Sequence, residues 1–271
     1  MDAESDPQFE PQEFYPVFGR LPKGGDAVIC GGQAVNLLAA VFLSDDELNG
    51  ILGDKGSATS GDMDIVVSKE LKELIEKNQN NKAHGFRVKR FADCRQPIEF
   101  AIIPDDMPDT RIDVLRSVKG VDIKKDRVFE NAIDIEAPFK VMNPVTLLIA
   151  KAENCATLEQ MGPNGKRNDI THLKMLVPIV RNYFNELVTH SDPTPQAQRG
   201  IINQLKRLQA ASTSLNFIKG FRIADVKLSK VVPAKVIQEG RLPMLKEFFE
   251  RTWIPKTNAR QSEKPLGPSD E

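Results

Sequence analysis

The strongest constraint on the fold is a change of residue pattern near residue 142. Before it, short apolar runs with two-residue alternation predict strands, notably FRVKRF, IEFAIIP and RIDVLRSV, which are separated by the turn-forming DCRQP and DDMPD. From Pro144 onward, apolar residues recur at helical spacing instead. We therefore predict an α+β fold, in which a mixed β-sheet with flanking helices is followed by an all-helical C-terminal domain.

The same change divides the chain into three predicted parts: a sheet domain over residues 1–142, a helical domain over residues 143–260 and a disordered tail over residues 261–271. The tail, QSEKPLGPSDE, is too polar to bury much apolar surface. In the helical domain, QAQRGIINQLKRLQAASTSLNFI predicts one long helix. In the sheet domain, DDELNGILGDKGSATSG is rich in Gly, Ser and Asp and predicts a loop.

The composition excludes several classes of protein. A chain of 271 residues with 40% hydrophobic and 28% charged residues is typical of a soluble globular protein with one or two domains. No apolar run approaches the roughly 20 residues of a membrane span, and the acidic start MDAESDPQFEPQEF does not resemble a signal peptide. Cys30, Cys94 and Cys155 are odd in number and lack metal-ligand spacing. The three histidines are scattered along the chain, and His172 is predicted to be a surface or capping residue. We expect a reduced, cytoplasmic protein without a membrane anchor.

The net charge of −1 conceals a polarity along the chain. Residues 1–64 hold twelve acidic and three basic side chains, whereas residues 199–260 hold thirteen Lys or Arg and four Asp or Glu. Such a basic segment is either the solvated outer face of helices or a patch that binds a phosphate backbone. The sequence leaves both interpretations open.

Two aspartates stand at the start of a predicted strand, in the run GDMDIVV. Because side chains on a strand alternate, Asp62 and Asp64 point to the same face. Two adjacent carboxylates raise each other's pKa unless a cation lies between them, and oxygen ligands of this kind suit Mg²⁺. Taken alone, the pair is better explained by two aspartates at the end of a strand that cap a loop.

Two further features favour a metal site. Upstream, ICGGQAVNLL places Gly31 and Gly32 between a strand and a helix, where backbone N–H groups can approach a phosphate closely. Downstream, Asp113 lies in the middle of the apolar strand RIDVLRSV, and an isolated buried Asp is costly without a partner. Three carboxylates on adjacent strands beside such a turn are typical of two-metal phosphoryl transfer.

These motifs, GGQA, SGDMDIVV and RIDVL, resemble the signature of the DNA polymerase β-like nucleotidyltransferase superfamily. In the rear half, LLIAKAENCATL and GKRNDITHLKML are similar to the Lys-bearing and Arg/Lys-Asp-bearing helical motifs of the abortive-infection (AbiE-type) toxin nucleotidyltransferases. Those proteins are the toxin halves of bacterial toxin–antitoxin pairs. The resemblance covers residues 26–180 and implies that residues 1–142 form a nucleotidyltransferase catalytic domain.

The resemblance also implies roles for individual residues. Asp62 and Asp64 would bind two Mg²⁺ ions, and Asp113 would bind the catalytic one and help to deprotonate the attacking hydroxyl. The predicted nucleotide-binding residues are Gly31, Gly32, Lys151, Lys166 and Asp169.

Within the nucleotide-binding set, the two glycines would hold the triphosphate through backbone amides, and Lys151 would reach it as a point charge. Asp169 would orient Lys166 or the arginine after it, or serve as an accessory carboxylate. The alternatives are a helix-surface lysine at position 151 and a helix N-cap at Asp169.

The implied activity is metal-dependent transfer of a nucleotide from a nucleoside triphosphate, ATP or another, to an acceptor hydroxyl. The basic rear half and the toxin resemblance favour RNA, such as a tRNA, as the acceptor, with a cognate antitoxin as a protein partner. One alternative is a small-molecule acceptor, as in the aminoglycoside nucleotidyltransferases. Another is a non-catalytic nucleotide- or RNA-binding protein of the same fold.

Overall fold

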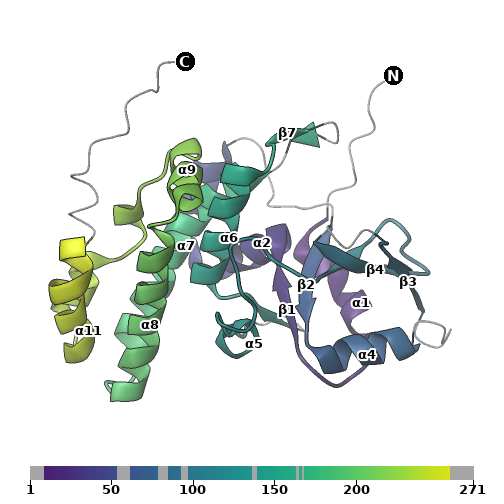
Figure 1. The fold of residues 1–271 in the computed structure, drawn as a ribbon, viewed down its shortest axis with the longest axis horizontal. Helices are drawn as coiled ribbons and strands as arrows, with labels where there is room; N and C mark the ends of the chain where they lie inside the picture. The colour runs from purple at the N-terminus through teal and green to yellow at the C-terminus, as the bar shows by residue number, and fades with distance from the viewer. Residues whose placement is uncertain are drawn as a thin grey trace.

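A computed structural model describes residues 9–53, 62–78, 85–92, 97–135, 139–162, 165–166 and 168–256. It confirms the predicted α+β class: a mixed sheet with flanking helices is followed by a helical C-terminal part. Figure 1 shows the sheet at one end of the molecule and helices α8 (Pro195–Ala211) and α11 (Pro243–Phe248) at the other. No helix in the described ranges combines the length and the apolar character that crossing a membrane requires.

The main sheet has six strands in the order β3-β4-β5-β2-β1-β6. Their bounds are β1 Ala27–Cys30, β2 Met63–Val67, β3 Phe86–Arg90, β4 Ile98–Pro104, β5 Ile112–Leu115 and β6 Lys140–Val141. A separate hairpin pairs β7 (Met161–Gly162) with β8 (Gly165–Lys166). The strands predicted from alternation are therefore confirmed.

Helices surround the sheet and form the rear of the molecule. Those of the front half are η1 Pro11–Phe14, α1 Tyr15–Phe18, α2 Gly31–Phe42, α3 Asp45–Leu52, α4 Lys69–Asn78 and α5 Val128–Asn131. Those of the rear half, besides α8 and α11, are α6 Pro144–Thr157, α7 Asp169–His190, α9 Leu215–Ile223, η4 Leu228–Lys230, α10 Ala234–Glu239 and η5 Phe249–Trp253.

The central strands bring distant parts of the chain together. β2 pairs with β1 in antiparallel and with β5 in parallel orientation, although β3 and β4 lie between β2 and β5 in the sequence. In this register Asp64 lies opposite Cys30 on one side and Asp113 on the other. The ends of two strands and the start of α2 therefore meet at one point of the sheet.

Both halves share one hydrophobic core in the described residues. α2 packs against β1 and β2, α7 packs against α2 and α6, and α9 packs against α6. The buried apolar side chains form a continuous cluster from Phe14 to Trp253. The change of residue pattern near residue 142 coincides with the passage from β6 to α6. The division into separate domains stays a prediction.

The loop predicted over DDELNGILGDKGSATSG is wrong in its first half, where residues 45–52 form α3. The reason is a capping box: the backbone N–H of Glu47 donates to Ser44 Oγ (3.3 Å), and that of Ser44 donates to Glu47 Oε2 (3.2 Å). These reciprocal bonds stabilise a helix start that the Gly-rich composition concealed. Residues 54–61 lie outside the described part of the chain.

The single helix predicted over residues 196–218 is also wrong, because α8 ends at Ala211 and α9 begins at Leu215. Ser212 Oγ donates to the backbone carbonyl of Gln209 (2.7 Å), and Ser214 Oγ accepts from the backbone N–H of Phe217 (3.5 Å). Hydroxyl groups that bond to nearby backbone in this way end one helix and start the next. The predicted disordered tail, residues 261–271, lies outside the described part.

Candidate active site

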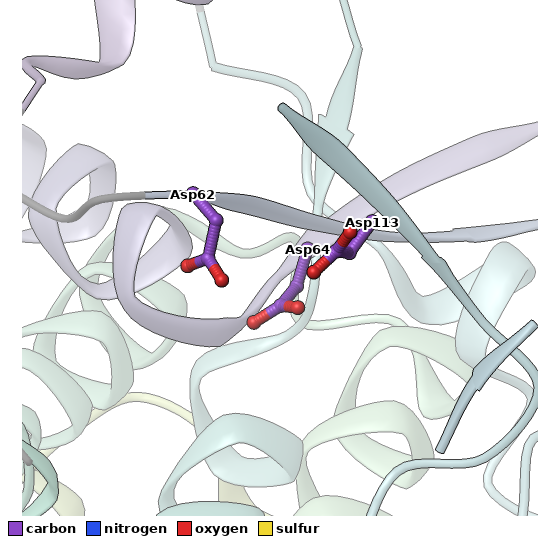
Figure 2. A group of neighbouring side chains, drawn as sticks. All are labelled: Asp62, Asp64 and Asp113. Atoms are coloured by element: carbon purple, nitrogen blue, oxygen red, sulfur yellow. The ribbon is translucent and has the colours of Figure 1, made fainter. Parts of the chain in front are cut away.

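Three carboxylates converge where β2 and β5 lie side by side. Asp62 immediately precedes β2, Asp64 is its second residue, and Asp113 lies opposite Asp64 in β5. One carboxylate oxygen from each residue lies within 4.8 Å of the other two. Figure 2 shows Asp62 and Asp64 leaving their strand on the same side and the Asp113 carboxylate directed toward Asp64. The sequence prediction that these strands are neighbours is confirmed.

Crowding and burial make these carboxylates hard to ionise together. Burial, followed by the charges of Asp62 and Asp113, raises the pKa of Asp64 from 3.8 to about 7. Burial raises the pKa of Asp113 to about 6, although the Arg111 guanidinium acts in the opposite direction. A divalent cation among the three groups would remove the repulsion and favour their ionised forms.

Arg111 provides a positive charge at the cluster that the sequence analysis missed. Its Nη2 donates to Asp113 Oδ2 (2.7 Å) and lies 3.5 Å from Asp62 Oδ2. The signal was present in the sequence, because residues two apart on an extended strand share a face. Arg111 therefore partly neutralises the aspartates in the protein without a metal.

The donor set fits a hard divalent metal ion. Asp113 is fully buried, and its Oδ1 has no hydrogen-bond partner in the described residues. A buried oxygen without a partner costs free energy, which a bound cation would recover. Carboxylate oxygens are also the ligands that Mg²⁺ prefers. Asp62, Asp64 and Asp113 together thus offer a suitable set of ligands.

The Gly-Gly segment lies directly against this cluster. We expected a turn between strand and helix, but Gly31 is itself the first residue of α2. Its φ is +69°, and a Cβ at this position would lie 2.0 Å from Asp64 Oδ2. Only glycine satisfies both the left-handed backbone and the close approach. The absence of a side chain at Gly31 therefore brings the N-terminus of α2 next to Asp64.

A cavity of about 490 Å³ opens beside the carboxylates. This volume is within the range of pockets that bind small molecules. The predicted site residues that line it are Gly31, Gly32, Asp62, Asp64, Asp113, Lys151 and Asp169. The side chain of Lys166 lies outside the described residues, so its predicted role stays a prediction.

Lys151 and Asp169 form a buried ion pair in the wall of the cavity. Lys151 Nζ donates to Asp169 Oδ1 (2.7 Å), and their side chains are only 8% and 2% exposed. The alternative of a helix-surface lysine is therefore wrong. Asp169 is the first residue of α7, whose N-cap is Asn168, so the N-cap alternative is wrong as well. Asp169 thus pairs with Lys151, whereas its predicted pairing with Lys166 or the arginine after it involves side chains outside the described residues and stays a prediction.

Other polar residues of the cavity were not singled out from the sequence. Asn154 lies one helical turn from Lys151, and His172 lies one turn from Asp169, and both line the cavity. His172 is buried, so its predicted surface position is wrong. The signal that could have found them is the spacing of three residues, which places side chains on one face of a helix.

The comparisons with known proteins add little. A scan against protein-family models gives no match, and a search of curated proteins gives none. Among solved structures, the polyadenylate synthase of Megavirus is similar to the chain, with a TM-score of 0.30 and 12% sequence identity. The match covers 97% of this chain and 51% of that one, so the chain spans about half the viral protein's length. A similarity this low assigns no activity, which must be argued from the geometry of the site.

Proposed function

We propose that the protein is a metal-dependent nucleotidyltransferase that moves a nucleotide from a nucleoside triphosphate to an acceptor hydroxyl. One observation carries the proposal: carboxylates from two paired strands lie within 4.8 Å of one another, and one of their buried oxygens lacks a hydrogen-bond partner in the described residues. The cavity beside them has the size for a small-molecule substrate. Carboxylate sets of this kind hold the metal ions of phosphoryl-transfer enzymes.

In this proposal Asp62 and Asp64 would hold two Mg²⁺ ions, and Asp113 would hold one of them. The bound ions would supply charge neutralisation at the phosphates and a lowered pKa of the acceptor hydroxyl. The acceptor oxygen attacks the α-phosphorus, the bond from that phosphorus to the bridging oxygen breaks, and pyrophosphate leaves with the electron pair. Asp113 would help to deprotonate the hydroxyl, as the sequence resemblance implies.

The triphosphate would lie at the N-terminus of α2. The N–H groups of the first turn and the helix dipole favour an anion there, and the sequence resemblance implies that Gly31 and Gly32 would hold it through backbone amides. Lys151 has three donor protons, so it can bond to Asp169 and still donate to a phosphate. From the sequence resemblance, Lys166 would contribute a second positive charge.

We propose RNA, such as a tRNA, as the acceptor, because the rear half is basic. The described segment 199–256 contains twelve Lys or Arg residues, and all except Arg207 are exposed; these eleven are called the basic surface below. Surface cations of this density favour a phosphate backbone.

A small-molecule acceptor is the second candidate. The observation that favours it is the lining of the carboxylate cavity, which comes from residues 30–172 and includes no residue of the basic surface. The proposed role as the toxin of a toxin–antitoxin pair, with an antitoxin as partner, depends on the sequence resemblance alone. Growth arrest on expression that is absent with Asp64→Asn would support it, and normal growth with active enzyme would contradict it.

The decisive test uses each nucleoside triphosphate labelled at the α-phosphate, with Mg²⁺ and either total RNA or an aminoglycoside. We expect label on RNA, release of pyrophosphate, and loss of both with Asp113→Asn. Label on the aminoglycoside alone would replace the RNA proposal by the second candidate. The absence of pyrophosphate release with every donor and acceptor, from protein that binds Mg²⁺, would contradict nucleotidyl transfer.

A further inference from the structure

A second cavity, of about 400 Å³, lies outside the candidate active site. Its walls are the loop before α5, the start of α6 and one face of α8, and in Figure 1 α5 lies between α8 and the sheet. Val145 lines this cavity, whereas Asn154 lines the carboxylate cavity. These residues are nine positions, or about two and a half turns, apart on α6. The two cavities therefore lie against opposite faces of that helix.

The second cavity is positively charged. Its ionisable residues are Lys125, Arg127, Arg207 and Asp126. Arg207 Nη2 lies 2.8 Å from Asp126 Oδ2, and Arg207 also donates to Thr146 of α6. Arg207 and Asp126 thus neutralise each other, and Arg207 connects α8 with α6 and with the loop before α5. The charges of Lys125 and Arg127 remain for a ligand.

The partners of these two side chains bind them weakly. Lys125 Nζ lies 3.4 Å from Asp122 Oδ2, and Arg127 Nε lies 3.9 Å from Glu130 Oε1. All four side chains are largely exposed, and exposed ion pairs of this kind contribute little free energy. A ligand with a phosphate group can therefore replace the carboxylates at small cost.

The loop that carries Lys125 and Arg127 is held in place by its own hydrogen bonds. Asp122 Oδ1 accepts from the backbone N–H groups of Lys124 (3.2 Å) and Lys125 (3.0 Å), and Asp126 Oδ2 accepts from that of Asp122 (2.9 Å). Arg127 has φ +49° and ψ +53°, the left-handed region that non-glycine residues avoid. Such strain persists where the surrounding structure over-determines it, often at binding sites.

The remaining wall suits a nucleotide rather than an apolar ligand. The amide side chains are those of Asn131, Asn143, Asn203 and Gln204, whereas Val145 is the apolar residue of the lining. Asn143 and Gln204 already bond to each other and to Tyr183, and Asn131 Nδ2 donates to the backbone carbonyl of Asp126 (2.9 Å). Asn203 and the remaining positions of Asn131 are therefore the amide groups that can match a base edge, and cations bind phosphate. A cavity of about 400 Å³ is also larger than an inorganic ion requires.

The surroundings favour a strand over a free nucleotide. Arg199, Asn203 and Lys206 follow one another on α8 at spacings of four and three residues, so they share a stripe of the helix, and all three are exposed. Asn203 lines the cavity, and Arg199 lies one turn before it on the same face. Lys206 Nζ lies over the Phe248 ring, 5.7 Å from its centroid. A chain with one nucleotide in the cavity would therefore meet a further cation at Arg199.

We propose that the second cavity binds one phosphorylated nucleotide of the acceptor RNA, with Lys125 and Arg127 contacting phosphate and Asn131 and Asn203 contacting the base. The inference rests on the proposed function, because it assigns a place to the RNA acceptor. It locates that acceptor's contact at this loop and α8 rather than over the whole basic surface.

The test measures the affinity of the full chain for a short single-stranded RNA by fluorescence anisotropy, with EDTA present and no nucleoside triphosphate. The first variant is Lys125→Ala with Arg127→Gly, since glycine adopts the left-handed backbone freely. The second is Gly200→Leu, which fills the cavity from α8, where a Cβ would have no neighbour within 4 Å. We expect each to weaken RNA binding by about tenfold.

Matched controls separate the site from general effects. Lys69→Ala with Lys77→Ala removes two exposed charges from α4, and Gly50→Leu adds the same side chain to α3, where a Cβ would also have no neighbour. Both controls should bind RNA within about twofold of the parent. In the first variant, the slope of log K against log[salt] should become shallower by about 1.4, as expected when two phosphate contacts on a single strand are lost.

Three outcomes would overturn the inference: unchanged RNA affinity in both cavity variants, an equal loss in the controls, or a loss confined to binding of free adenosine monophosphate or inorganic phosphate. Because the binding assay contains neither metal nor triphosphate, these outcomes would not contradict the proposed nucleotidyl transfer. Conversely, RNA binding that depends on the cavity, with no transfer in the labelled-triphosphate assay, would remove the proposed function and retain the site.

Discussion

The carboxylate cavity and the basic surface are both charged, but they differ in what holds the charges. Asp64 and Asp113 lie on paired strands, burial raises their pKa values to about 7 and about 6, and Gly31 packs against one of them. The cations of the basic surface are exposed. Buried charges need partners at defined distances, so they indicate chemistry, whereas exposed charges contribute mainly a long-range potential. The comparison therefore supports the proposed catalytic role of the first region by defined contacts and the proposed binding role of the second by charge alone.

The largest effect is expected from Asp64→Asn in the carboxylate cavity. The loss of a charged metal ligand should reduce nucleotidyl transfer by about a thousandfold, or about 4 kcal/mol in activation free energy. The measurement is pyrophosphate release with Mg²⁺ over a range of triphosphate concentrations. Lys230→Ala, on the basic surface, is the control and should retain transfer to a small acceptor. Turnover within about tenfold of the parent in Asp64→Asn would contradict the assignment of the triad.

The next effect concerns the buried ion pair of the same cavity. Lys151→Met leaves the Asp169 carboxylate buried without its partner and should lower the free energy of unfolding by about 3 kcal/mol. Adding Asp169→Leu removes the remaining buried charge and should restore much of this loss. Urea denaturation of the single and double variants measures both values. If Lys151→Met is as stable as the parent protein, the Lys151–Asp169 ion pair does not stabilise the fold.

The carboxylate cavity should make the free energy of unfolding depend on pH. The folded pKa of Asp64, about 7, lies above its ordinary 3.8, so the native state binds the extra proton between these values. The free energy of unfolding without metal should therefore fall as pH rises from about 4 to about 7. We expect a loss of about 2 kcal/mol, reduced from the full shift because Arg111 and solvent screen the charge.

Denaturant titrations at pH 5 and pH 8 with EDTA measure this loss. Asp64→Asn should reduce the pH dependence, because the substituted residue does not titrate, whereas Asp113, with its pKa raised to about 6, still does. Mg²⁺ should remove the loss at pH 8 by occupying the carboxylates. The outcome that would refute the explanation is the same pH slope in Asp64→Asn as in the parent protein.

The smallest effect on stability is expected at the basic surface. Replacing the exposed Lys206, Lys227 and Lys230 by Glu should change the free energy of unfolding by no more than about 0.5 kcal/mol. Triphosphate binding should be unchanged, whereas RNA modification should weaken, more so at low salt. Arg207→Glu is the contrasting variant, because Arg207 is half-buried and paired with Asp126. If Arg207→Glu were as stable as the triple Lys→Glu variant, the paired Arg207 would contribute no more to stability than the exposed cations, which would contradict the comparison.

Much of the candidate site could be predicted because its signals are local. The spacing of Asp62 and Asp64 places both on one face of a strand, and an Asp inside an apolar run needs a partner. The sequence predictions were wrong where hydrogen bonds between side chains and nearby backbone determine where a helix begins or ends. The capping box of Ser44 and Glu47 stabilises α3 where a Gly-rich loop was predicted. Hydroxyl–backbone bonds at Ser212 and Ser214 end α8 and start α9 where one helix was predicted.

The sequence by itself determined the strand and helix pattern, the change near residue 142 and the carboxylates at the strand positions, since each follows from side-chain periodicity along a short segment. The sequence also predicted that these two strands are neighbours, but the tertiary structure alone decided the register, which places Asp113 of β5 opposite Asp64 of β2. It likewise decided that Arg111 bridges two aspartates and that Lys151 pairs with Asp169 across two helices. These contacts join residues whose partners are selected by packing and by the cost of burying an unpaired charge, and neither quantity is a property of a local segment.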